Sequence, residues 1–178
     1  MIKIGVVGPE ESKWKPEQIP KTKSYIRDIF NKYASDTLTH GPYKPLVLVS
    51  GHCPKFGVDI WAEEVADKLG IKKEIYAPEV NQWEDKIFPS FGMPSVEDKK
   101  QKGYRSRNID MAKVCDICYC IVPRAGKGQI VDVSDARKYN RNIYCIHCKE
   151  FGHPTNGGCW TMKYAEKLGK EVHLAVIG

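Results

Sequence analysis

Residues 46–70 read LVLVSGHCPKFGVDIWAEEVADKLG and join a short apolar run to a helical pattern through a turn that contains two glycines. The run from Leu46 to Val49 is predicted to form a strand that ends at Ser50-Gly51. From Val58 to Leu69, apolar side chains recur at the spacing of one helix face, and Gly70 follows where a helix would end. A strand, a turn and a helix in this order indicate one unit of a parallel sheet covered by helices.

The same alternation recurs along the rest of the chain. Other strands are expected from Ile2 to Val7, Glu74 to Ala77, Ile117 to Val122 and Val172 to Ile177, with a further candidate from Ile143 to Ile146. Other helices are expected from Thr22 to Tyr33, Asn108 to Val114 and Thr161 to Leu168. The sequence therefore predicts an α/β fold built on a parallel sheet.

Two segments fit neither pattern. Residues 81–103 mix Trp, Phe, Pro and Lys without a sustained period, which is typical of a lid or an irregular excursion. Residues 124–156 indicate an insertion, and together with Cys159 they give a small Cys/His-rich region over residues 124–159. No internal repeat and no Gly/Ser-rich linker is visible, so we expect a single domain over residues 1–178.

The composition is that of an ordinary globular chain, with 178 residues of which 42% are hydrophobic and 28% charged. No apolar segment is long enough for a membrane helix, and the first residues show no signal-peptide pattern. We therefore expect a cytoplasmic protein with no membrane partner. The formal net charge of +6 is spread along the chain and fits an anionic partner or simply a solvated surface. The sequence leaves the oligomeric state open, a homo-oligomer included.

Three glycine turns lie where a predicted strand ends or a helix begins. They are Gly8-Pro9, the turn from Ser50-Gly51 to Gly57, and Gly157-Gly158 ahead of Thr161. Glycine lets backbone N–H groups approach a ligand, and the start of a helix offers unpaired N–H donors and partial positive charge. Because such turns gather at the carboxyl ends of parallel strands, we expect them to seat a phosphate group. Neither the dinucleotide fingerprint nor the Walker motif is present.

Asp59 and Arg107 are charged candidates for contact with the ligand. Asp59 lies in the first turn of a predicted helix, where it either stabilises the helix start or accepts a hydrogen bond from a ligand hydroxyl such as that of a ribose. Arg107 precedes a short helix, where it either pairs with a phosphate through charge-assisted hydrogen bonds or is a surface arginine.

These motifs in combination resemble the SLOG superfamily. Val47 to Gly51 and Gly57 to Asp59 are similar to its second strand, turn and helix, Arg107 to Ala112 to its Arg-Asn helix, and Gly157 to Thr161 to its closing glycine turn. The resemblance implies a Rossmann-like parallel sheet with helices on both faces. It also implies a nucleotide or nucleotide-derived ligand, with Arg107 and Asn108 among its contacts. The superfamily includes cytokinin-activating phosphoribohydrolases, DNA-processing proteins and sensors of nucleotide signals, so the fold does not select an activity.

One departure from the superfamily bears on the activity. The phosphoribohydrolases carry the motif Pro-Gly-Gly-x-Gly-Thr-x-x-Glu with a catalytic glutamate, whereas residues 157–164 read GGCWTMKY. Because that glutamate is missing, we favour a protein that binds a phosphate-bearing, nucleotide-like small molecule, as a sensor or an uncharacterised hydrolase. An N-glycosidic hydrolase that uses Asp59 or Glu63 in place of the glutamate is one alternative.

Cysteine and histidine are concentrated near the end of the insertion. Cys145, Cys148, His153 and Cys159 follow the spacing Cys-x2-Cys-x4-His-x5-Cys, which resembles a zinc knuckle with one extra residue before the last cysteine. Four protein ligands would leave no open position on the metal. The expected zinc is therefore structural and holds the insertion against the glycine turn that contains Cys159.

Two alternatives to this reading remain open. His147 could replace one of the four proposed ligands, and the site would be three-coordinate and open if Cys159 faced the pocket instead. A knuckle also suits single-stranded nucleic acid, so a nucleic-acid-binding protein is the other alternative function, although only Tyr139, Arg141 and Tyr144 supply aromatic and basic side chains beside the cluster.

Overall fold

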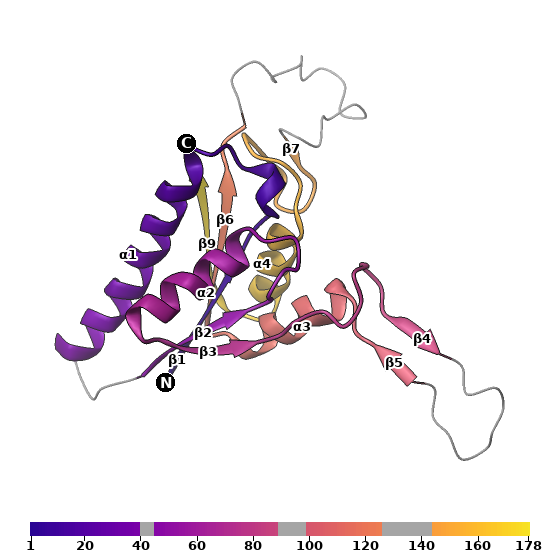
Figure 1. The fold of residues 1–178 in the computed structure, drawn as a ribbon, viewed down its shortest axis with the longest axis horizontal. Helices are drawn as coiled ribbons and strands as arrows, with labels where there is room; N and C mark the ends of the chain where they lie inside the picture. Colours follow the sequence, from indigo (N-terminus) through magenta and orange to yellow (C-terminus); the bar gives the residue numbers. More distant parts are fainter. Residues whose placement is uncertain (40–44, 89–98, 126–143) are drawn as a thin grey trace.

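Five parallel strands form the central sheet of the computed structural model, which describes residues 1–39, 45–88, 99–125 and 144–178 (Figure 1). The strand order is β3-β2-β1-β6-β9. The bounds are Ile2–Val7 for β1, Leu46–Ser50 for β2, Lys72–Ile75 for β3, Ile117–Pro123 for β6 and Glu171–Ile177 for β9. In the middle of the sheet, Ile4 of β1 pairs with Leu48 on one side and with Ile117 on the other. The predicted α/β fold with a parallel sheet is confirmed.

Helices cover both faces of the sheet. On one face, α1 (Gln18–Thr39) and α2 (Val58–Leu69) bury a core that includes Phe30 and Trp61. On the other face, α3 (Tyr104–Val114) and α4 (Gly157–Lys167) bury a second core that contains Met111 and five buried cysteines. The Rossmann-like arrangement implied by the sequence is therefore present.

The elements differ from expectation at their bounds, most of all in α1, which runs from Gln18 to Thr39 instead of from Thr22 to Tyr33. Strand β3 starts two residues before the predicted Glu74, because it is an edge strand whose residues are only partly buried and need no apolar run. Helices α3 and α4 each start four residues before the predicted Asn108 and Thr161. As a result, Gly157 and Gly158 are the first two residues of α4 and not part of a turn ahead of it.

The two irregular segments form small antiparallel pairs in their described parts. Within residues 81–103, β4 (Lys86–Phe88) pairs with β5 (Lys99–Gln101), and the pair projects away from the sheet (Figure 1). In the predicted insertion, β7 (Tyr144–Cys145) pairs with β8 (Glu150–Phe151). Tyr139, Arg141 and most of the insertion lie outside the described residues, as does the first residue of the candidate strand from Ile143.

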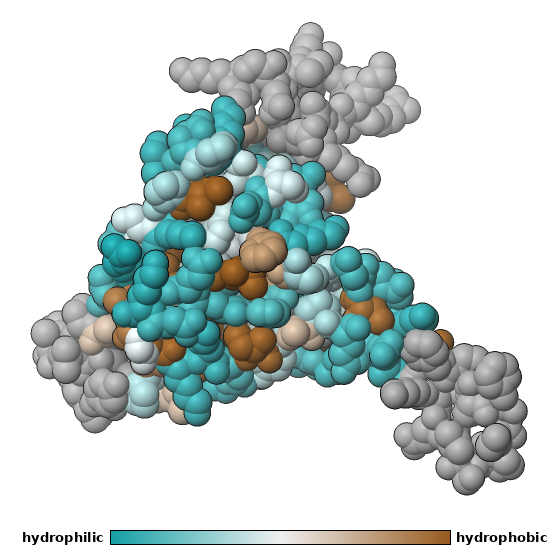
Figure 2. Space-filling view, in the orientation of Figure 1, coloured by the Kyte–Doolittle hydropathy of each residue, from teal (hydrophilic) through white to brown (hydrophobic). Residues whose placement is uncertain are grey.

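Hydrophilic side chains cover most of the face shown in Figure 2, with apolar residues scattered among them. Among the described residues, no helix has both the length and the apolar character needed to cross a membrane.

The order of the strands fixes where a ligand can approach. From β1 the chain goes to β2 on one side and returns later as β6 on the other, so the strand order reverses between β1 and β6. In sheets of this kind, ligands bind at the carboxyl ends of the strands beside such a reversal. Helices α2, α3 and α4 each lead back to the amino end of a strand, so all three begin at this carboxyl edge.

Gly57, ahead of α2, offers a direct test of how the loops at this edge are packed. Its φ of 102° and ψ of −150° suit glycine alone, and an added Cβ would lie 2.4 Å from the carbonyl oxygen of Pro9. Gly70 also has a positive φ, of 68°, but open space around it. We expect Gly57→Ala to lower the free energy of unfolding by about 3 kcal/mol and Gly70→Ala by about 1 kcal/mol in urea denaturation. Equal losses would contradict the packing of the Gly57 turn on the loop after β1.

Candidate functional site

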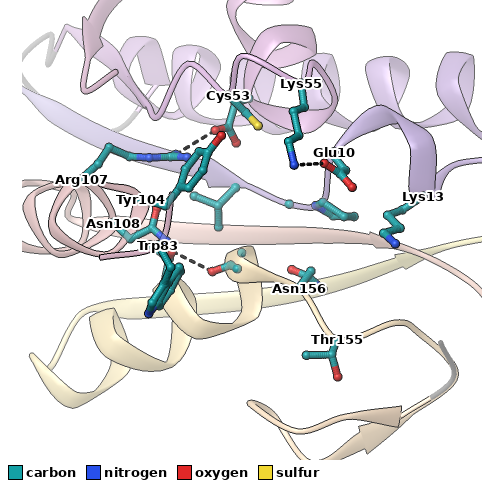
Figure 3. A pocket seen from close by; sticks show the side chains of 17 residues that line it. Glu10, Lys13, Cys53, Lys55, Trp83, Tyr104, Arg107, Asn108, Thr155 and Asn156 are labelled. Carbon is teal, nitrogen blue, oxygen red and sulfur yellow. Dashed lines mark hydrogen bonds and ion pairs between the residues drawn. The ribbon is translucent and has the colours of Figure 1, made fainter. Parts of the chain in front are cut away.

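A cleft of about 270 Å³ opens at the carboxyl edge of the sheet (Figure 3). Its walls come from the loop after β1, the turn before α2, and the first turns of α3 and α4. Eight of the residues predicted to bind the ligand line it, namely Gly8, Pro9, Asp59, Arg107, Asn108, Gly157, Gly158 and Thr161. The cleft is thus the place where separate parts of the predicted site meet.

Four other candidates do not line the cleft. The open side of Gly51 is filled by Arg107, whose Nη1 would lie 1.4 Å from an added Cβ. Gly57 packs against the loop after β1, as described above. Ser50 Oγ donates a hydrogen bond to Glu63 Oε1 at 2.6 Å, and the other oxygen of that carboxylate bonds to Nδ1 of His52 at 2.9 Å. Glu63 is therefore engaged away from the cleft.

Gly8 and Gly158 are in direct backbone contact. A Cβ added to Gly158 would lie 2.7 Å from the Cα of Gly8, which leaves no room for any side chain between them. This contact places the end of β1 against the first turn of α4. Two of the three predicted glycine turns therefore meet, while the third is covered by Arg107.

The first turn of α4 offers backbone donors to the cleft. Asn156 caps the helix by accepting a hydrogen bond from the N–H of Cys159 at 3.0 Å. Gly157 is exposed, and within the described chain no acceptor faces the N–H groups of Gly157 and Gly158. Unpaired N–H groups and the partial positive charge of a helix start favour an anion at this position.

Basic side chains add to this preference. Lys13 and Lys55 line the cleft, and both were missed in the sequence because isolated lysines carry no pattern. Nζ of Lys55 lies 3.4 Å from Oε2 of Glu10, whereas Lys13 makes no ion pair within the described part of the protein. With Arg107, three cations face the two carboxylates of Glu10 and Asp59, so the cleft carries an excess of positive charge.

Asp59 and Arg107 form a buried ion pair at the back of the cleft. Arg107 Nη1 lies 2.9 Å from Asp59 Oδ2, and the two side chains are only 7% and 5% exposed. Burial raises the pKa of Asp59 above its ordinary value, although Arg107 and the backbone N–H of Cys53 act in the opposite direction. The Nε of Arg107 is buried and has no hydrogen-bond partner among the described residues. An unpaired buried donor is costly, so this atom favours an acceptor from a ligand.

Two aromatic residues that the sequence did not reveal also line the cleft. Trp83 comes from the irregular segment before the β4–β5 pair, and Tyr104 begins α3. Cys53, Thr155 and Asn156 also line the cleft. None of these residues belongs to a periodic run, so only the folded chain brings them to the cleft.

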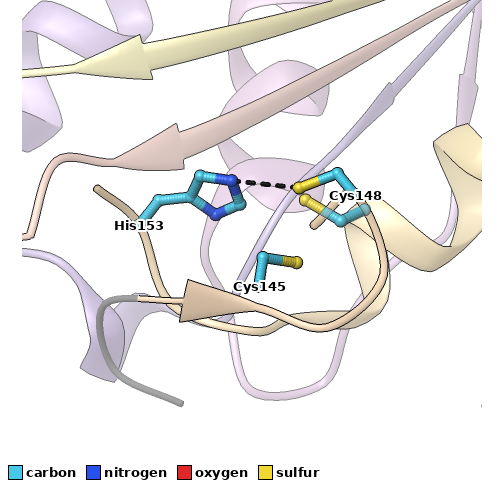
Figure 4. Close-up of side chains that lie close together, drawn as sticks. Cys145, Cys148 and His153 are labelled. Atoms are coloured by element: carbon cyan, nitrogen blue, oxygen red, sulfur yellow. Dashed lines mark hydrogen bonds between the residues drawn. The ribbon is translucent and has the colours of Figure 1, made fainter. Parts of the chain in front are cut away.

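The four predicted metal ligands lie together, with Cys159 in the first turn of α4; Figure 4 labels the other three, Cys145, Cys148 and His153. The ligand atoms of Cys145, Cys148, His153 and Cys159 are all within 4.8 Å of one another, and His147 is not part of this group. Tetrahedral zinc with Zn–S of about 2.3 Å and Zn–N of about 2.0 Å would place its ligands ~3.5–3.8 Å apart. The cluster is therefore close to the arrangement that such an ion requires, and it can hold a metal.

The surroundings of the cluster also fit metal binding. Nδ1 of His153 lies 3.1 Å from the carbonyl oxygen of Pro154, to which it can donate, leaving Nε2 free to point at Cys148 Sγ at 3.2 Å. Hydrogen bonds lower the pKa of Cys145 to about 4, first from Cys159 and then from backbone N–H groups of residues 147 and 148. A thiolate at Cys145 is the form that binds a metal.

The cluster and the cleft share one stretch of chain. Residues 154–158 run between the proposed ligands His153 and Cys159, and residues 155–158 of this stretch form one wall of the cleft. Asn156 donates to the carbonyl oxygen of Pro154 at 2.9 Å and lies 3.5 Å from Cys159 Sγ. Any ion held by the cluster would therefore fix this wall at both ends.

Comparison with known proteins adds one likeness. No protein-family model matches the chain, and no curated protein matches it. Among solved structures, it is similar to the molybdenum cofactor carrier protein from Chlamydomonas reinhardtii, with 16% sequence identity and a TM-score of 0.48, over 97% of this chain and 75% of that one. At this identity and TM-score, the likeness carries no information about what the present chain binds.

The buried pair should behave as a unit in stability measurements. Asp59→Leu or Arg107→Met alone leaves one buried charge without its partner and should lower the free energy of unfolding by about 3–5 kcal/mol. The double variant removes both charges and should lose far less than the sum. As a control, Glu166→Ala breaks the exposed pair with Lys163 and should cost less than about 1 kcal/mol. Additive losses for the buried pair, measured by urea denaturation, would show that the two charges do not compensate each other.

Proposed function

We propose that the cleft binds a phosphate-bearing, nucleotide-like small molecule, with its phosphate group at the first turn of α4. The observation that carries this proposal is the convergence of unsatisfied donors in one cleft. The N–H groups of Gly157 and Gly158, the ammonium group of Lys13 and the buried Nε of Arg107 have no acceptor within the described chain. A group with several acceptor oxygens and a negative charge satisfies such a set. The resemblance to the SLOG superfamily in the sequence points to the same class of ligand.

In this proposal Asp59 positions Arg107 and does not bind a ribose hydroxyl itself. One of its oxygens bonds to Arg107, and it also accepts from the backbone N–H of Cys53. Asp59 holds the guanidinium through Nη1, and Nε has no partner among the described residues. Asn108, which is buried beside Arg107 in the first half of α3, and Thr161 of α4 supply further polar groups in the cleft.

Neither alternative class has an observation that favours it over ligand binding. For an N-glycosidic hydrolase, the Asp59 carboxylate is engaged by Arg107 and Glu63 is engaged by Ser50 and His52. For a nucleic-acid-binding protein, a cleft of about 270 Å³ suits a small molecule better than a strand.

We also propose that the cluster of Cys145, Cys148, His153 and Cys159 holds a structural zinc ion. Three thiols and an imidazole are a donor set that zinc prefers, and four protein ligands complete its coordination. None of the seven cysteines, all of which lie in the described residues, forms a disulfide, so the three thiols of the cluster are available to a metal. The role of the ion would be to hold residues 153–159, and with them the first turn of α4, in place.

The ligand proposal predicts a loss of binding when a cation of the cleft is removed. Lys13→Ala should weaken binding of AMP about tenfold or more, because one charge-assisted contact to the phosphate is lost. Lys68→Ala, in the last turn of α2, removes an equal charge outside the cleft and should leave the affinity unchanged. Isothermal titration calorimetry gives both values.

A thermal-shift survey provides the broader check on the same proposal. At a ligand concentration of ~100 times the Kd, binding should stabilise the protein by about 2.7 kcal/mol. If no nucleotide or sugar phosphate in a broad panel changed the melting temperature, the cleft would not be a phosphate site.

The metal proposal predicts one zinc ion per chain by elemental analysis. Cys148→Ser should lose the ion and lower the melting temperature, whereas Cys53→Ser, outside the cluster, should keep both at the wild-type value. Removal of zinc with a chelator should weaken AMP binding, because the wall formed by residues 155–158 is released. Protein without zinc that melts and binds AMP like the untreated protein would contradict the proposed role.

A further inference from the structure

Two aromatic side chains stand at one end of the cleft and a lysine at the other. Figure 3 shows Trp83 and Tyr104 together beside Arg107, with Lys13 at the opposite end and Asn156 between them. Trp83 is still 39% exposed, although it is a large apolar side chain. The cleft is therefore polarised into an aromatic end and a basic end.

Trp83 is held in place by the start of α3. Its carbonyl oxygen accepts from the N–H of Arg105 at 2.9 Å, and the carbonyl oxygen of Gln82 accepts from the N–H of Tyr104 at 2.8 Å. Asp85 accepts from the N–H of Gly103 at 2.8 Å. These bonds satisfy N–H groups at the helix start that otherwise have no partner. The segment that carries Trp83 is thus fixed by the helix, unlike a freely moving loop.

The ring of Trp83 is also oriented by its neighbours. It meets Trp160 of α4 edge-on, with ring centres 5.2 Å apart and planes at 89°, and Trp160 stacks on Tyr164. Tyr104 is fixed in turn, because its hydroxyl donates to Asn81 and the guanidinium of Arg107 lies 5.5 Å from the centre of its ring. Packing within the protein therefore accounts for the orientation of Trp83 but leaves over a third of its surface uncovered.

We infer that Trp83 and Tyr104 form a wall that recognises a planar ring of the ligand by stacking. This inference rests on the proposed function, since it names the part of the ligand that lies beyond the phosphate. A ring atom of Trp83 is 3.9 Å from the position of an added Cβ on Gly157. The wall is therefore adjacent to the proposed phosphate site at the first turn of α4, which is called the phosphate seat below. A ring and a phosphate group joined by a short linker, such as a pentose, can reach both at once.

The size of the cleft limits the ligand further. Its volume of about 270 Å³ is slightly below the usual range of small-molecule sites, ~300 to 1,000 Å³. A cleft of this size favours a small ligand with one planar ring system, one linker and one phosphate group. The wall would thus select a ligand that has a planar ring, and the small cleft would limit that ligand to one ring system.

Three probes separate the wall from the phosphate seat. Ribose 5-phosphate carries the phosphate without a ring, adenosine carries the ring without a phosphate, and AMP carries both. Trp83→Ala should weaken AMP and adenosine binding about 5- to 150-fold, the range for loss of one stacked base, and leave ribose 5-phosphate unchanged. Trp83→Phe should retain most of the affinity. Lys13→Ala should weaken AMP and ribose 5-phosphate but not adenosine.

The control is Ile87→Ala, which removes an exposed apolar side chain of β4 outside this cleft and should change none of the three affinities. Melting temperatures of all variants show whether they are folded. If Trp83→Ala leaves AMP binding intact while Lys13→Ala weakens it, the proposed phosphate site is supported and the proposed stacking wall is contradicted. If none of the three probes binds the wild-type protein, both the proposed function and the wall are overturned.

Discussion

The backbone contact between Gly8 and Gly158 is the constraint on which the cleft depends. It joins the end of the central strand β1 to the start of α4, two places far apart in the sequence, at a distance that excludes any side chain. Because the end of β1 touches the start of α4, Gly157 and Gly158 line the same cleft as Lys13, which lies in the segment after β1. The other walls, from α2 and α3, are added around this contact, and the cysteine and histidine cluster abuts it through Cys159.

The buried pair of Asp59 and Arg107 shows how charge is arranged behind that contact. Two charges with almost no exposure are tolerated only because each compensates the other. The guanidinium of Arg107 still lacks a hydrogen bond from Nε, which has no partner in the described chain. A protein that keeps an incompletely satisfied cation at the base of a cleft retains attraction for an anion there, and this attraction agrees with the open donors of α4.

Local patterns in the sequence predicted the elements but only part of the site. The bounds of β1 and α2 follow directly from an apolar run and a helical stripe, and the four grouped ligands follow from their spacing. The starts of α3 and α4 were placed too late, because a first helical turn needs no apolar residue. The bond between Asp59 and Arg107 joins residues 48 positions apart, and Trp83 is placed by hydrogen bonds to α3. Neither arrangement leaves a trace in local periodicity.

The first turn of α4 has a thermodynamic consequence for binding. Side chains such as that of Lys13 lose rotational freedom when they close on a ligand, and this loss opposes association. The N–H groups of Gly157 and Gly158 belong to a helix start already fixed by Asn156 and by the contact with Gly8. They have no rotamers to lose, so an anion seated there gains its hydrogen bonds at little cost in conformational entropy.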